Sequence, residues 1–177
     1  MPFFLKEIEV VDKVASHASV LIVICRFCPA ASMAARYGGT YLEPLRRGLN
    51  TESLEVHVGQ LVSRLRERGI RTRVMRGNLR NLVVCMWTSC QRERLRELAA
   101  DQEALVVMGC RGAFESVCKM VETTACRVYR GMEDEAILAV TPKVHFPLRI
   151  SLDLFAMTPM QATRDEVDQW CAGATQT

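Results

Sequence analysis

The amino-acid sequence predicts an α/β protein in which a mainly parallel sheet is covered by helices on both faces. Three short apolar runs, at residues 19–24, 82–84 and 104–108, are each followed by the start of a helix. Unbroken runs of this kind are typical of strands buried on both faces of a parallel sheet. Strands that alternate with helices in this way occur in flavodoxin-like and Rossmann-like folds.

Residues 1–130 are expected to form this α/β domain. The amphipathic residues 5–15 form either a short helix or an N-terminal strand. Pro29 favours a helix start before the Ala-rich segment 30–37, and apolar residues at three- and four-residue spacing predict a long helix over 51–68 that ends at Gly69. Further helices are expected at 88–100 and 113–123, and further strands at 71–75 and 126–129.

Residues 131–177 are expected to form a β-rich C-terminal annex and a short helix, packed on the same domain. We expect a charged turn at 133–135, a short strand at 136–140, and a loop bracketed by Pro142 and Pro147. Residues 148–155 alternate between apolar and polar side chains, which suits a half-exposed edge strand. Thr163 is expected to cap the last helix.

The composition excludes several classes of function. The chain has 177 residues, of which 49% are hydrophobic, and a net charge of +3. This size allows a substantial core, and no clustered basic face of the kind that nucleic-acid binding needs is visible. Charged residues interrupt the first 14 positions, and no apolar run approaches the length of a membrane span. We therefore expect a cytoplasmic protein without a signal peptide, bound neither to nucleic acid nor across a membrane.

The eight cysteines are the main candidates for chemistry, because disulfides are rare in a reducing compartment. Cys25 and Cys28 follow the first apolar run, and Cys85 and Cys110 end the other two. Ligands of open α/β sheets bind at the carboxyl ends of strands, and a helix N-terminus favours a thiolate. We expect Cys25, Cys28, Cys85 and Cys110 to bind one metal centre, an iron–sulfur cluster or alternatively zinc, with Cys90 as reserve ligand.

Other roles for these residues stay open at this point. Any one cysteine also suits a small apolar position in the core, and packing positions are expected for Cys118, Cys126 and Cys171. Arg26 and Arg111 stand beside the cysteines and are candidates for lowering a thiol pKa or binding an acidic cofactor. The three histidines lie far apart in the sequence, and no Walker loop or hydrolase motif is present.

The order of these motifs resembles that of the small iron–sulfur (delta) subunit of methyl-viologen-reducing hydrogenases, which passes electrons to heterodisulfide-reductase-type complexes. The resemblance covers about residues 18–125 and rests on three segments: the Cys25–Cys28 pair, the region of Cys85, and Gly109-Cys110 followed by Cys118. In that family, cysteines of these segments carry a two-iron cluster. The resemblance therefore implies an iron–sulfur cluster here.

Three functions follow from this reasoning. The first is an accessory redox subunit that binds a cluster or metal and relays electrons among the other subunits of a cytoplasmic complex, because the acid–base groups of a free-standing enzyme are not visible. The second is a dithiol protein in which Cys25 and Cys28 perform thiol–disulfide or sulfur-transfer chemistry, with Arg26 supporting the thiolate. The third is a structural or interaction domain whose cysteines fill the core.

Overall fold

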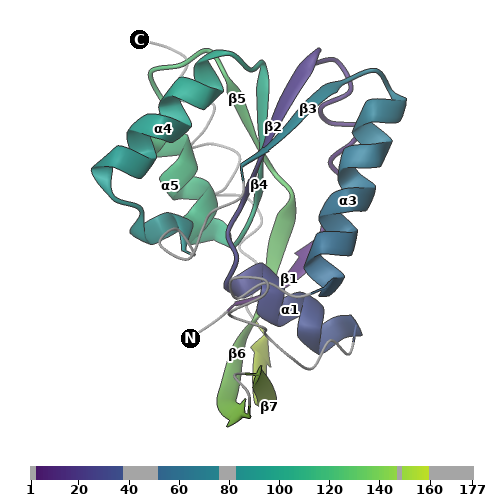
Figure 1. Cartoon of the computed structure of the whole chain (residues 1–177), viewed down its shortest axis with the longest axis vertical. Coiled ribbons are helices and arrows are strands. Elements are labelled where there is room, and N and C mark those ends of the chain that lie inside the picture. Colours follow the sequence, from purple (N-terminus) through teal and green to yellow (C-terminus); the bar gives the residue numbers. More distant parts are fainter. Residues whose placement is uncertain (1–2, 38–51, 76–82, 147–148, 160–177) are drawn as a thin grey trace.

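The protein combines a parallel sheet of four strands with an antiparallel sheet of three (Figure 1). The computed structural model describes residues 3–37, 52–75, 83–146 and 149–159. The strand order is β3-β2-β4-β5 in the parallel sheet and β1-β6-β7 in the antiparallel sheet. The prediction of an α/β protein with a parallel sheet is confirmed at this level.

The parallel sheet is built from β2 (Ser19–Ile24), β3 (Arg71–Met75), β4 (Ala104–Met108) and β5 (Arg127–Arg130). Every residue of β2 and β4 is buried, which agrees with the unbroken apolar runs in the sequence. The two strands pair in parallel, from Val20 opposite Ala104 to Ile24 opposite Met108. The chain leaves β2 toward β3 and then returns to the other side of β2 as β4. The carboxyl ends of β2 and β4 therefore flank the point at which the strand order reverses.

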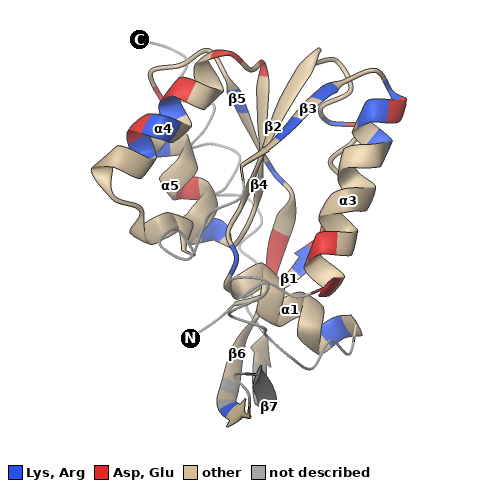
Figure 2. Ribbon diagram, in the orientation of Figure 1, with Lys and Arg blue, Asp and Glu red and all other residues tan. Residues whose placement is uncertain are grey.

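Helices cover the parallel sheet on both sides. α3 (Glu52–Glu67) lies on one side, and α4 (Ser89–Ala100) and α5 (Arg111–Val121) lie on the other (Figure 1). α1 (Cys28–Tyr37) packs against α3 and β1. The sequence predicted each of these helices, as well as the end of α3, where Gly69 has a φ of 76°. Acidic and basic residues are interspersed along α4 (Figure 2).

The expected strand at 82–84 is wrong. Val84–Met86 is instead a 3₁₀ helix, η2, which packs against α5; Val83 before it is extended, and residue 82 lies outside the described residues. A run of three apolar residues is too short to distinguish a strand from another buried segment by its pattern. Consequently only two of the three predicted strands, 19–24 and 104–108, are neighbours in the sheet.

The antiparallel sheet brings together both ends of the described chain. It consists of β1 (Phe3–Glu7), β6 (Met132–His145) and β7 (Arg149–Pro159). β1 is the strand alternative predicted for the start of the chain, and it pairs with residues 132–137 of β6. β7 is an edge strand, as the alternation over 148–155 predicted. The β-rich annex therefore includes a strand from the N-terminal end. The last helix expected after Thr163 lies outside the described residues, as does Pro147.

Two local predictions for this region are wrong. Residues 133–135 are part of β6 and not a turn, because β1 pairs with Glu133 and Asp134 and continues past the irregularity to Ala136. Pro142 does not begin a loop, because β6 continues to His145 opposite β7. Beyond Ile137, β6 pairs only with β7 among the described strands, and a strand with one such neighbour tolerates a residue that lacks an N–H.

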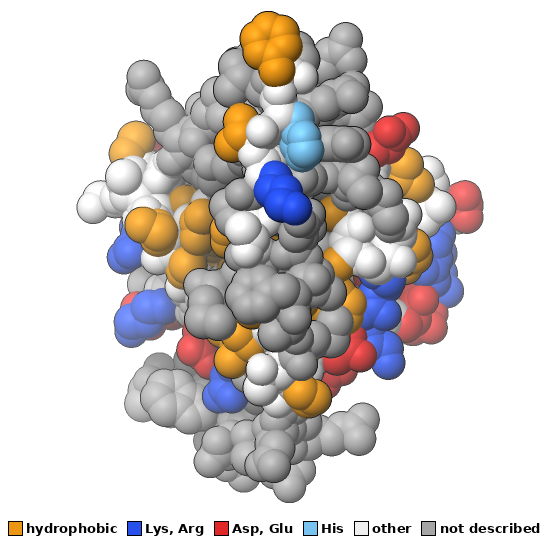
Figure 3. Space-filling model, turned by 90° about the horizontal axis from the view of Figure 1, so that it is seen from below, with side chains coloured by type: hydrophobic (Ala, Val, Ile, Leu, Met, Phe, Trp, Pro, Cys, Tyr) orange, Lys and Arg blue, Asp and Glu red, His pale blue; other side chains and the backbone are white. Residues whose placement is uncertain are grey.

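The β6–β7 ribbon projects beyond the lower end of the parallel sheet (Figure 1). At its end, Val144 and Phe146 are 73% and 99% exposed. Seen from below, hydrophobic side chains, a basic side chain and a histidine are exposed close together on this end of the molecule (Figure 3). In the described parts of the chain, no helix has the length and apolar character that crossing a membrane requires.

Gly131 joins the two sheets. It lies between β5 and β6, where its N–H donates to the Val107 oxygen at 2.9 Å and its oxygen accepts from the Ile8 N–H at 3.2 Å. A Cβ at this position would lie 2.5 Å from the Met108 sulfur, 3.0 Å from Cγ1 of Val106 and 3.2 Å from the Val107 oxygen, so the absence of a side chain lets the backbone come this close to β4. The start of β6 is thereby held against the carboxyl end of β4.

Candidate functional site

Four cysteines gather at the carboxyl edge of the parallel sheet. Cys25 directly follows β2, where its N–H continues the ladder by donating to the Met108 oxygen at 2.9 Å. Cys28 begins α1, Cys85 lies in η2, and Cys110 is the N-cap residue of α5. Cys25, Cys28 and Cys110 are buried, whereas Cys85 is exposed. The edge is the one that the sequence predicted, although Cys85 reaches it from a 3₁₀ helix.

Gly109 makes the close packing at this edge possible. A Cβ on Gly109 would lie 2.9 Å from the Cβ of Ala113 and 3.1 Å from the Cβ of Cys25. Both distances are shorter than ordinary contacts, and neither neighbour has a flexible end that could move aside. The absence of a side chain here therefore lets α5 begin directly beside Cys25.

The Cys28 thiol lies close enough to the Cys110 sulfur to share a hydrogen bond with it. This bond raises the pKa of Cys28, which donates, and lowers the pKa of Cys110, which accepts, to about 6. Burial acts against the thiolate of Cys110, whereas the N–H groups of Ala113 and Gly112 favour it. The Cys110 side chain makes no standard capping hydrogen bond, so these N–H groups act through proximity to its sulfur. Cys110 is therefore the thiolate of the pair and Cys28 is the thiol.

Cys25 and Cys85 complete the cluster at longer range. Burial raises the pKa of Cys25 to about 11, and the neighbouring Cys110 and Cys85 add to this effect. Burial and the proximity of Cys110 also raise the pKa of Cys85. The four predicted ligands thus influence one another. Within the described ranges, however, no three His, Cys, Asp or Glu side chains are arranged so that they could hold one metal ion.

The remaining candidates from the sequence have different positions. Cys90 is exposed in the first turn of α4 and takes no part in the interactions just described. Arg26, which stands between the two cysteines of the Cys-x-x-Cys segment in the sequence, is buried. The Arg111 guanidinium forms an ion pair with Glu115 along α5, at 2.7 Å.

The other cysteines have packing roles. Cys118 packs against the main core, and Cys126 is buried within it, directly before β5. Burial raises the pKa of Cys126 to about 11. These positions agree with the prediction, and Cys171 lies outside the described residues. Among the described cysteines there is no disulfide.

A partly buried carboxylate beside Cys110 is a part of the site that the sequence did not indicate. Asp134 of β6 accepts the N–H of Arg111, the first residue of α5, at 2.9 Å. It also pairs with Arg130 at 2.9 Å, and the two side chains are 8% and 19% exposed. Burial raises the pKa of Asp134, whereas the Arg111 N–H and the Arg130 guanidinium oppose this. Asp134 lay in the segment that the sequence predicted as a turn, where a charged residue carries no such signal.

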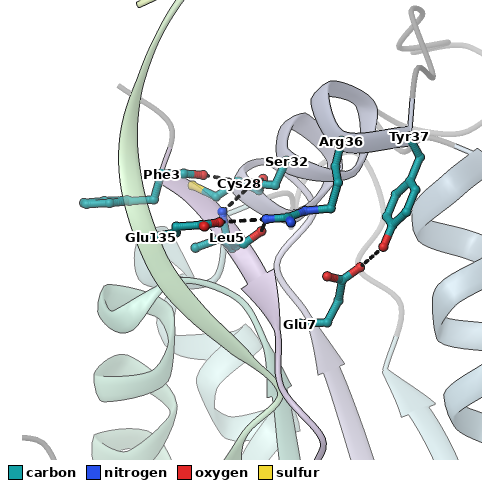
Figure 4. A network of polar contacts seen from close by, with 8 residues as sticks. All are labelled: Phe3, Leu5, Glu7, Cys28, Ser32, Arg36, Tyr37 and Glu135. Carbon is teal, nitrogen blue, oxygen red and sulfur yellow. Dashed lines mark hydrogen bonds and ion pairs between the residues drawn. The ribbon is translucent and has the colours of Figure 1, made fainter. Parts of the chain in front are cut away.

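A second unpredicted contact holds the start of α1 against β1 (Figure 4). The hydroxyl oxygen of the buried Ser32 accepts the N–H of Leu5 at 2.8 Å. The single hydroxyl hydrogen is shared between the oxygens of Cys28 at 2.8 Å and Phe3 at 3.1 Å. The nearby backbone of Phe3 acts to lower the pKa of Cys28. Ser32 therefore joins the first turn of α1, which begins with Cys28, to the antiparallel sheet.

Comparison of the chain with protein-family models, with curated proteins and with solved structures finds no match. The resemblance to the hydrogenase delta subunit, which rests on the order of the cysteine motifs, stays a prediction.

Proposed function

We propose that the protein is a thiol–disulfide redox protein whose redox couple is Cys28 and Cys110. The observation that carries this proposal is that Cys28 and Cys110, at the starts of α1 and α5, lie close together at the edge where ligands of such sheets bind. The sequence suggested Cys25 and Cys28 as the couple. Cys25 is the poorer partner because burial keeps it protonated, with a pKa of about 11.

The reaction is an exchange with an external disulfide. The Cys110 thiolate attacks one sulfur of that disulfide, its S–S bond breaks, and one thiolate leaves. Cys28 then loses its proton and attacks the Cys110 sulfur of the mixed disulfide, which releases the second thiolate. One released sulfur takes the proton of Cys28, and the other takes a proton from the solvent, because Cys110 reacts as a thiolate. The external disulfide is thus reduced to two thiols, and Cys28 and Cys110 are oxidised to one disulfide.

The topology also supports a ligand site here. Counting only the parallel strands, their order is 2-1-3-4, which matches the first four strands of the flavodoxin-like order. We therefore propose that the parallel sheet is of the flavodoxin-like or Rossmann-like type. In such sheets, the reversal point lies between the first and third strands, and Cys25 and Cys110 follow these two strands here.

A redox titration tests the proposed couple. The reduced protein is equilibrated with glutathione buffers of increasing potential, trapped by alkylation, and mapped by mass spectrometry. We expect a reversible disulfide between Cys28 and Cys110, lost in Cys28→Ser and Cys110→Ser and retained in the matched variant Cys126→Ser. A reversible disulfide that joins other cysteines, or none at all, would refute the proposal.

A metal centre is the second candidate function. The mutual influence of Cys25, Cys28, Cys85 and Cys110 on their pKa values favours it, because a soft metal ion stabilises several neighbouring thiolates. The donor type fits zinc or an iron–sulfur cluster, although the described side chains would have to move closer around the ion. In this role the protein would relay electrons among the subunits of a cytoplasmic redox complex.

Anaerobic purification separates the two candidates. A metal centre predicts zinc, or iron with acid-labile sulfide and a visible absorption band, in the wild type and in Cys126→Ser but not in Cys28→Ser. Equal metal content in the two variants, or none in the wild type, would exclude this candidate.

A further inference from the structure

We propose that the antiparallel sheet positions both sulfurs of the Cys28–Cys110 couple, with Ser32 and Asp134 as the positioning residues. The inference rests on the proposed redox function and adds what sets the equilibrium of that couple. Its basis is that one sheet contacts the starts of two helices that lie far apart in the sequence. These helices are α1, which begins with Cys28, and α5, which begins directly after Cys110.

The contact with α1 runs through Ser32. This side chain is 1% exposed, and it joins the Leu5 N–H of β1 to the first turn of α1. Arg36, one turn further along α1, pairs with Glu135 of β6 at 2.7 Å (Figure 4). Its guanidinium also lies 4.8 Å from the centre of the Phe4 ring. The same interface contains a small apolar cluster of its own, which consists of Phe4, Ala31, Ala136 and Leu138. The position of the start of α1 is therefore set by its contacts with the antiparallel sheet.

The contact with α5 runs through Asp134. Both of its carboxylate oxygens accept the Arg111 N–H, at 2.9 and 3.2 Å, and Arg130 holds the carboxylate from β5. Arg111 is the residue directly after Cys110. The start of α5 is thus held to β6 by a hydrogen bond to a partly buried carboxylate, which is stronger than a hydrogen bond between neutral groups.

The two contacts meet at one place in the sheet. Leu5 and Asp134 are opposite each other in the β1–β6 pair, beside an irregularity between Phe4 and Leu5. A register shift of this kind bends the strand and redirects its groups away from the regular ladder. Here the Leu5 N–H donates to the hydroxyl oxygen of Ser32, and the Asp134 carboxylate accepts the N–H of Arg111 at the start of α5. One pair of residues therefore sets the distance between the two helix starts.

This arrangement bears on the redox equilibrium because a disulfide demands a narrow range of geometries. Its Cβ atoms lie about 3.5–4.5 Å apart, so two thiols held near that separation form the bond more readily than two that move independently. Loosening the contact of Ser32 or of Asp134 lowers the effective concentration of the Cys28 thiol beside the Cys110 sulfur. The result is a disulfide that is more easily reduced.

The test compares Ser32→Ala with Ser116→Ala. Each serine donates to the carbonyl oxygen four residues earlier in its helix, but the Ser116 contact is exposed, whereas Ser32 is buried and also contacts Leu5 and Phe3 of the antiparallel sheet. We expect Ser32→Ala to lower the equilibrium constant for disulfide formation against glutathione about tenfold, which is about 30 mV for two electrons. Ser116→Ala should stay within about twofold of the wild type. Equal constants for Ser32→Ala and Ser116→Ala would overturn the proposal.

Asp134 provides an independent second test. Asp134→Ala should lower the constant in the same way, and Asp134→Asn, which keeps an oxygen for the Arg111 N–H, should recover part of the loss. If Asp134→Ala has the same equilibrium constant for disulfide formation as the wild type, β6 does not position Cys110.

A trivalent arsenical, which binds two neighbouring thiols without oxidising them, separates this inference from the redox function. If the wild type forms no Cys28–Cys110 disulfide, the proposed function fails, and arsenical binding then decides the positioning. Weaker binding to Ser32→Ala than to Ser116→Ala supports the inference. Equal binding overturns it.

Discussion

The thiolate of Cys110 depends mainly on Cys28, so Cys28→Ala should abolish its low pKa. The hydrogen bond from Cys28 is the largest cause of the lowering to about 6. Without it, burial and the Asp134 charge raise the pKa, whereas the N–H groups of Ala113 and Gly112 lower it. We expect the pKa of Cys110 to reach at least the ordinary value of about 8.5.

The magnitude determines which measurement is informative. At pH 7, the thiolate fraction would fall from about 90% at a pKa of 6 to about 3% at a pKa of 8.5. A thiolate of higher pKa is intrinsically more reactive, by about tenfold over this interval for a Brønsted coefficient of about 0.45. The alkylation rate at one pH would therefore change little. The pH at which the rate reaches half of its plateau is the quantity to measure.

The assay is alkylation of the reduced, metal-free protein by iodoacetamide from about pH 5 to about pH 10, with mass spectrometry of the Cys110 peptide. We expect a midpoint near 6 in the wild type and in the control Cys126→Ala, and a midpoint of about 8.5 or above in Cys28→Ala. Cys28→Ser should lie between these values because its hydroxyl still donates a hydrogen bond. A midpoint near 6 in Cys28→Ala would show that Cys28 does not stabilise the thiolate.

Three further predictions concern stability. Gly109→Ala should cost about 1–3 kcal/mol in urea unfolding of the reduced protein, because its Cβ would lie 2.9 Å from that of Ala113; a loss below about 0.5 kcal/mol would show that the backbone gives way. Asp134→Ala should cost about 3 kcal/mol by the same assay, because it leaves the mostly buried Arg130 unpaired, and wild-type stability would contradict this reasoning. Burial raises the pKa of Cys126 to about 11, so above about pH 8.5 the unfolded chain loses this proton and the folded protein keeps it. Stability should therefore fall as the pH rises from about 8.5 to about 11, and it should fall less steeply in Cys126→Ala; equal slopes would count against the burial effect.

The sequence by itself determined the parts of the protein that depend on local pattern. The unbroken apolar runs of β2 and β4 predicted two buried parallel neighbours, and the spacing of Leu54, Val58, Leu61 and Leu65 predicted the buried face of α3. It also placed cysteines at the carboxyl edge of the sheet, because a residue that ends a parallel strand lies at that edge whatever the rest of the chain does.

Local pattern was insufficient where a distant segment decides the backbone. The three apolar residues at 82–84 suit a strand, but Val84 is buried in a 3₁₀ helix that packs against α5. The charged residues at 133–135 suit a turn, but β1, more than a hundred residues away in the sequence, pairs with them as a strand. In both cases long-range packing outweighs the local preference.

Only the tertiary structure decided which cysteine sulfurs lie close together. Cys25 and Cys28 are close in the sequence, yet Cys25 continues the ladder of β2. Cys28 instead begins a helix, and its thiol lies beside the sulfur of Cys110. That pairing exists because β2 and β4 lie side by side and because Gly109 lets α5 begin beside Cys25. The contacts of Ser32 with Leu5 and of Asp134 with Arg111 join residues 27 and 23 positions apart. Spacing along the chain cannot reveal such contacts, because the direction of each side chain is set by the element that carries it and by the segments packed against that element.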